Sequence, residues 1–86
     1  MIKSLVQRIE MQARLLGEMM ERLGVDPEIA ACEAGGAGLA AVALRCRACG
    51  SRAECRRFLD EATGSVPAAP AFCPNGDFLA RAVPGA

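Results

Sequence analysis

Four cysteines limit what this 86-residue chain can fold into more than any other feature. Cys46, Cys49 and Cys55 follow one another with the spacing C-x2-C-x5-C, and Cys73 comes after seventeen further residues. A domain of this size buries little apolar surface, so its core alone is a weak source of stability and an additional cross-link or metal is expected. The fold is therefore expected to bring these cysteine-bearing segments together.

The hydrophobic periodicity predicts an all-α fold, a small bundle of about four to five short helices that forms a single domain over residues 1–86. The first helix is amphipathic and is predicted from about Ile2 to Leu23. Asp26 followed by proline is a typical helix start, since the carboxylate can cap the first turn. Glycines within residues 35–38 are expected to interrupt this second helix, and a third helix is predicted over about 39–47.

Two more helices are predicted in the second half of the chain. Ser51 and Glu54 have the form of a capping box, so a fourth helix is expected to run to about Thr63. Residues 64–70 contain two prolines and are predicted to be a loop. Asn75 is expected to cap a last short helix. The bundle would then close around the cysteines.

The cysteine spacing predicts one four-thiolate metal site formed by Cys46, Cys49, Cys55 and Cys73. Two cysteines separated by two residues can place both sulfurs on one metal centre. Zinc ribbons usually supply a second close pair of cysteines, whereas the third and fourth thiols arrive singly here, which favours a four-iron (4Fe-4S) cluster over one Zn2+. The proline after Cys73 is found at the closing ligand of bacterial ferredoxins, although Pro74 could equally well just end a loop.

Cys32 is the fifth cysteine, and we expect it to be a small buried side chain on the second helix. A ligand set in which Cys32 replaces Cys73 is sterically plausible as well. The chain contains no histidine, which excludes mixed Cys/His zinc sites, Rieske-type ligation and Ser-His or Cys-His catalytic pairs. There is also no phosphate-binding glycine loop with its lysine, so the sequence does not predict an enzyme.

The charge and the N-terminal sequence bear on location and on nucleic-acid or membrane binding. Ten basic and ten acidic residues cancel, and although five arginines gather within residues 45–57, the flanking segments are acidic, so nucleic acid is not an expected partner. The first residues lack the apolar stretch of a secretory signal, and we expect no membrane span. The sequence thus predicts a cytoplasmic protein, and clustered cysteines in that reducing compartment bind metals more often than they form disulfides.

Three residues on the first helix suggest a protein partner. Gly17 permits close approach of another helix, and Met19 and Met20 provide an adaptable apolar surface. Packing in the core explains the same methionines equally well. The sequence therefore leaves open an unknown protein partner, which could be a redox partner, and a homodimer through the first helix.

The cysteine pattern also resembles known families. The C-x2-C-x5-C core is similar to the cluster loops of helix-hairpin-helix DNA glycosylases and of WhiB-like regulators, both of which hold a four-iron cluster among helices, but neither similarity extends beyond the cysteines. The whole pattern resembles an uncharacterised family of short bacterial, typically proteobacterial, proteins. The residues that carry this resemblance are 17–25, Arg45-Cys46-Arg47-Ala48-Cys49, Cys55-Arg56-Arg57 and Phe72-Cys73-Pro74-Asn75. It favours Cys73 over Cys32 and implies no function, because that family is a domain of unknown function.

The expected function follows from the predicted metal. An iron–sulfur cluster would make the protein an electron carrier or a redox-responsive module, with backbone amides near the cysteines tuning its potential. The alternative is a structural zinc site that only stabilises the fold of a protein-interaction module, with no redox role.

Overall fold

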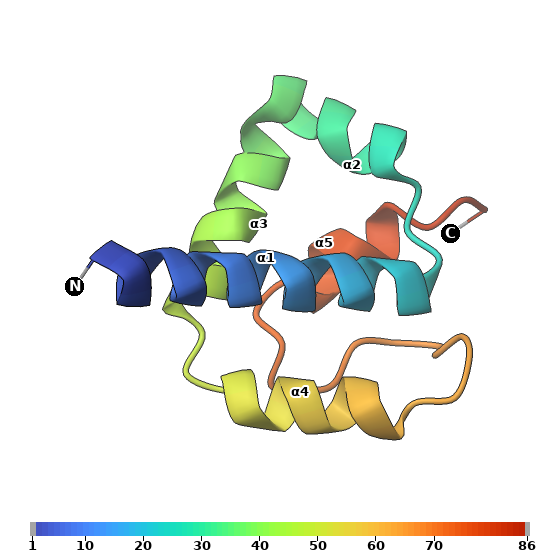
Figure 1. Cartoon of the computed structure of the whole chain (residues 1–86). Coiled ribbons are helices and arrows are strands. Elements are labelled where there is room, and N and C mark those ends of the chain that lie inside the picture. The colour runs from blue at the N-terminus through green and yellow to red at the C-terminus, as the bar shows by residue number, and fades with distance from the viewer. Residues whose placement is uncertain (1, 86) are drawn as a thin grey trace.

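The computed structural model describes residues 2–85, which form five α-helices and one 3-10 turn, with no strand among them (Figure 1). The elements are α1 (Ile2–Leu23), α2 (Pro27–Cys32), η1 (Glu33–Gly36), α3 (Ala37–Ala48), α4 (Arg52–Glu61) and α5 (Gly76–Arg81). The prediction of an all-helical fold is therefore confirmed, and α1 has the predicted bounds.

Helix α1 is the central element of the structure. In Figure 1, α2 and α3 form an arch on one side of α1, and α4 lies along the other side. Helices α3, α4 and α5 each contact α1. The buried apolar side chains come from all five helices or their ends, and they are Leu15, Met19, Ala30, Val42, Leu59, Phe78, Leu79 and Ala82. The core therefore runs along α1, between the arch and α4.

Helix α2 begins as predicted, because the Asp26 carboxylate accepts a hydrogen bond from the backbone N–H of Glu28 at 2.8 Å. The break that follows is a true change of chain direction. Ala34 and Gly35 have φ values of 51° and 64°, and Gly36 has a φ of 98°, so three consecutive residues lie outside right-handed helical geometry. Helix α3 starts directly afterwards, two residues earlier than predicted.

The segment Pro27–Ala48, which contains α2 and α3, is long and apolar enough to cross a membrane by length and composition. This differs from our expectation that no stretch would come close. The break at Ala34–Gly36 divides the segment, however, and the 12 residues of α3 extend only about 18 Å, against about 30 Å for the hydrocarbon core of a bilayer. Neither helix alone has the length of a span.

Two predicted helix caps lie at the predicted positions but lack the expected hydrogen bonds. Ser51 and Asn75 directly precede α4 and α5, but neither side chain makes a capping hydrogen bond. Asn75 points to α3 instead, where its Nδ2 donates to the backbone oxygen of Val42 at 3.1 Å and its Oδ1 accepts from Nε of Arg45 at 2.8 Å. Asn75 is only 2% exposed, so these partners on α3 satisfy an amide that water does not reach.

Candidate metal centre

The four predicted ligands lie on one side of α1, and they come from three parts of the chain. Cys46 is in the last turn of α3 and Cys49 directly follows it, Cys55 is on α4, and Cys73 is in the loop before α5. All four side chains are half-buried. They line one small cavity of about 30 Å³, called the thiol cavity below. Its other lining residues are Leu15, Leu16, Met19, Phe72, Pro74, Asn75 and Leu79.

Backbone turns present the first three cysteines. The N–H of Cys49 donates to the oxygen of Cys46 at 3.2 Å and closes the C-terminus of α3. The N–H of Ser51 then donates to Sγ of Cys49 at 3.4 Å, and the N–H of Cys55 donates to the oxygen of Ser51 at 2.8 Å in the first turn of α4. The x2 and x5 spacings thus correspond to a helix end, a short turn and a helix start.

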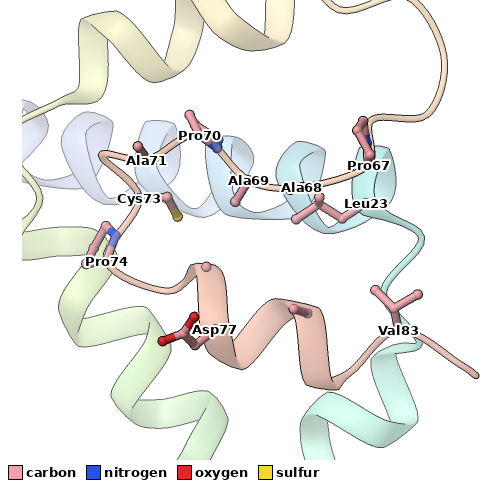
Figure 2. Close-up of a pocket in the computed structure, with 12 residues that line it drawn as sticks. Leu23, Pro67, Ala68, Ala69, Pro70, Ala71, Cys73, Pro74, Asp77 and Val83 are labelled. Atoms are coloured by element: carbon pink, nitrogen blue, oxygen red, sulfur yellow. The ribbon is translucent and has the colours of Figure 1, made fainter. Parts of the chain in front are cut away.

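Cys73 is held by a turn of its own. Its N–H donates to the oxygen of Pro70 at 2.9 Å, and its oxygen accepts from the N–H of Gly76 at 3.4 Å. The loop that contains this turn also borders a larger groove of about 440 Å³, which extends between residues 67–74, α5 and the end of α1 (Figure 2). Cys73 and Pro74 line both the groove and the thiol cavity, so the two hollows are neighbours at these residues.

Two buried polar side chains fix the end of α3 that carries Cys46. Gln12 of α1, which is 6% exposed, donates its Nε2 to the backbone oxygen of Arg47 at 2.9 Å, and its own backbone oxygen lies 3.9 Å from Sγ of Cys46. Asn75 donates to the same helix nearer its middle, at the backbone oxygen of Val42. Carbonyls in the last turn of a helix have no partner within that helix, so a side-chain donor here stabilises the end of α3.

An ion pair connects α4 to α1 beside Cys55. The two terminal nitrogens of Arg56 contact both carboxylate oxygens of Glu18 at 2.5 and 2.8 Å, and Arg56 also pairs with Asp60. The hydrogen bond from Arg56 holds the pKa of Glu18 below its usual value. This two-pronged geometry fixes the orientation of the guanidinium and thereby the position of α4 against α1.

The thiols of the cavity influence one another. Burial raises the pKa of Cys46, and the neighbouring thiols of Cys49 and Cys73 raise it further. Burial also raises the pKa of Cys55 to about 11, with smaller contributions from Cys46, Cys73 and Cys49. Without a metal, the Cys46 and Cys55 thiols are therefore protonated at neutral pH, which makes them poor nucleophiles.

The thiol cavity does not present a finished site for a single ion. Among residues 2–85, no group of three or more His, Cys, Asp or Glu side chains is arranged closely enough to hold a metal ion. The four-cysteine metal site thus remains a prediction. The residues available to it are four thiols within an apolar wall, with no carboxylate lining the cavity.

Cys32 is placed away from these thiols. It is the last residue of α2, where the break that follows leaves its side chain exposed, and it does not line the thiol cavity. The expectation that Cys32 would be buried is therefore wrong. The sequence analysis also missed the roles of Gln12 and Asn75. A signal for Gln12 was present, because it lies three residues before Leu15 and four before Leu16 on the apolar face of α1.

Comparison with known proteins identifies a family but no characterised relative. No curated protein and no solved structure matches this chain. One family model, described as a family of unknown function, matches residues 3–84 and thus nearly the whole sequence. The chain therefore belongs to the DUF6455 family of unknown function.

Proposed function

We propose that this protein binds a 4Fe-4S cluster through Cys46, Cys49, Cys55 and Cys73 and acts in the cytoplasm as a small electron carrier or redox-responsive module. The observation that carries the proposal is that these four thiols, from three parts of the chain, line one cavity whose other walls are almost entirely apolar. Cysteine thiolates are the usual ligands of such clusters.

The arrangement of the thiols supports a cluster over a single ion. A tetrahedral Zn2+ with bonds of about 2.3 Å requires all four sulfurs within about 4 Å of one another. The described residues include no group close enough to hold a metal ion, so the cysteines would have to shift to bind either metal. A cluster accepts more widely spaced sulfurs, because each of its irons needs only one of these thiolates. The apolar wall formed by Leu15, Met19 and Leu79 would also limit access of water to the centre.

A bound cluster would supply one-electron transfer, and the protein would hold it and tune its potential. The N–H of Ser51, which donates to Sγ of Cys49, is the kind of contact that shifts the potential of a cluster. For a redox partner docked in the groove shown in Figure 2, Cys73 would be the nearest ligand, because it is the one cysteine of the four that lines this groove. Electron exchange is therefore expected on the side of the molecule shown in Figure 2.

Structural zinc is the second candidate, and the size of the cavity favours it. A volume of about 30 Å³ is enough for roughly two water molecules or one ion. A cluster is larger, so the cysteine-bearing segments would have to move apart to accept it. In this alternative the metal only stabilises the fold, and the protein is an interaction module with no redox role.

The test is an optical spectrum combined with metal analysis of anaerobically purified protein. The chain has no Trp or Tyr, so thiolate-to-iron absorption at about 400 nm would stand out over a small 280 nm band. We expect a coloured protein that contains about four iron and four sulfide ions per chain. A colourless protein with one zinc would establish the alternative, and a protein that binds neither metal would exclude both.

A further inference from the structure

Gly17 is an unusual residue for its position. It lies inside the 22-residue helix α1, where glycine is a poor helix former compared with alanine. Gly17 is exposed, and a Cβ atom added to it would meet no other atom within 4 Å. Nothing within this chain therefore requires the missing side chain, which suggests that the requirement comes from a contact outside the chain.

Gly17 lines an open groove between α1 and α3. The groove has a volume of about 360 Å³, and most of its lining side chains are apolar or small. They are Gln12, Ala13, Leu16, Gly17, Met20, Leu39, Ala43, Cys46 and Arg47. The neighbouring face of α3 is apolar as well, since Leu44 is 63% exposed and Ala40 and Ala48 are exposed beside it. The groove and the Leu44 face lie next to each other.

The exposed area of the chain supports a missing contact of defined size. Its accessible surface is 5700 Å², whereas a compact monomer of this mass exposes about 4900 Å². The excess of roughly 800 Å² is the area that each partner buries in an interface of standard size. The molecule is also flat, with extents of 43 × 32 × 18 Å. One additional chain on one face would account for the excess.

The charges at the edges of the groove favour a second copy of the same chain. Glu21 lies four residues after Gly17 and Glu10 lies seven before it, so both are on the α1 edge of the groove, and together with Arg14 on the same edge they leave it net acidic. Arg47 is on the α3 edge. A two-fold axis would bring the acidic edge of each copy against the basic edge of the other.

We propose that this protein forms a two-fold homodimer in which the groove between α1 and α3 of each copy receives the exposed Leu44 face of the other. The contact depends on the helices and not on the metal, so it goes beyond the proposed function and can fail independently of it. It would bury Gly17 and cover the side of the molecule on which Cys46 and Arg47 reach the groove.

Sedimentation equilibrium of the anaerobically purified full-length chain tests the proposal. At about 100 µM, well above the micromolar Kd of even a weak interface of this size, we expect twice the chain mass of 9.0 kDa. Gly17→Gln places a polar side chain at the groove, where its Cβ meets no other atom within 4 Å, and glutamine favours the helix, so the variant is expected to be a monomer with undiminished helical circular dichroism. Leu44→Glu should also give a monomer.

Met11→Glu is the matched control, because Met11 is 55% exposed on α1 but does not line the groove, and this variant should remain dimeric. A monomeric wild-type chain at this concentration would overturn the proposal, and so would a dimeric Gly17→Gln variant. Binding of monomeric chains to vesicles that contain anionic lipid, without a dimer in solution, would overturn it in favour of a membrane surface.

Discussion

The thiol cavity and the segment formed by α2 and α3 are both apolar in sequence, but they differ in what covers them. Around the cavity, Leu15 and Leu79 are at most 3% exposed, and the buried Asn75 has hydrogen-bond partners. On the outer faces of α2 and α3, Ile29 and Leu44 are 40% and 63% exposed, whereas Ala30 and Val42 of the same helices are fully buried. Apolar composition therefore predicts where the helices form, but it does not predict which helix faces are buried. We expect contacts within one chain to be enough to stabilise the residues around the thiol cavity.

Replacing cysteines gives the sharpest test of this difference. Cys73→Ser removes a thiol that lines the cavity and should abolish binding of iron or zinc, because oxygen is a poor replacement for a soft thiolate ligand. Cys32→Ser changes an exposed thiol on the other segment and should leave metal loading intact. Metal content and the absorption at about 400 nm measure both effects. The reverse result would mean that Cys32, and not Cys73, is the fourth ligand.

Two leucines allow the same comparison for stability. Leu79 is 0% exposed and borders the cavity, so Leu79→Ala should lower the free energy of unfolding by about 2–5 kcal/mol. A small domain has little stability to lose, so this variant should unfold at a much lower urea concentration than the wild type. Leu44→Ala, at 63% exposure, should cost less than about 0.5 kcal/mol.

Urea unfolding at low protein concentration, where any dimer would dissociate, compares the two variants directly. Equal losses of stability would contradict the burial of Leu79 in the core and the exposure of Leu44. A large effect of Leu44→Ala that appears only at high protein concentration would instead report on self-association.

The helices were predictable from the sequence because their signals are local. The bounds of α1 follow from its apolar periodicity, and the start of α2 follows from Asp26 and the proline after it. The long-range contacts were not predictable in this way. Asn75 has the sequence position of a helix cap, but the packing of α5 against α3 turns its side chain towards Val42. Asn75 thus makes a buried hydrogen bond to a distant segment and does not cap its own helix.

In the candidate site, too, some features were predictable from the sequence and others were not. Cys46, Cys49, Cys55 and Cys73, which the spacing selects, line one cavity and Cys32 does not, while their role as metal ligands stays a prediction. The exposure of Cys32 was not predicted, and neither were the left-handed conformations of Ala34 and Gly35 that turn the chain after α2. A run of small residues does not specify which of them will take that conformation.

Removing the hydrogen bonds of Asn75 should have an effect of intermediate size. Asn75→Ala leaves the Arg45 side chain and the Val42 carbonyl without this partner and creates a small void, so it should cost about 1–3 kcal/mol. The loop that carries Cys73 would also be held less firmly against α3. Metal affinity should therefore fall together with the unfolding free energy, and both can be measured on one preparation.

Arg45→Gln is the control for Asn75→Ala, since it removes only the contact to Nε of Arg45 and keeps the buried bond to Val42. Arg45→Gln should lower the metal affinity and the unfolding free energy less than Asn75→Ala does. If Asn75→Ala were no worse than Arg45→Gln, the buried hydrogen bond to α3 would have no role in holding the cysteine-bearing loop.

The smallest expected effect concerns the ion pair of Glu18 and Arg56 that fastens α4 to α1. The hydrogen bond from Arg56 lowers the pKa of Glu18 below its usual 4.5. A lowered pKa in the folded state stabilises the fold fully above the usual value, and this contribution is lost as the pH falls through the lowered value. The pair is about one-third exposed, so salt should weaken it and its contribution should be modest.

Urea midpoints of the wild type and of Glu18→Gln, measured from neutral pH to about pH 3, test this linkage. The wild type should be more stable at neutral pH, and the difference between the two proteins should shrink as the pH falls below 4.5 and as salt is added. Glu61→Gln, at an exposed position on the same helix as Arg56, should show no comparable change. A difference that stays constant over this range would mean that Glu18 stabilises α4 by packing and not by its charge.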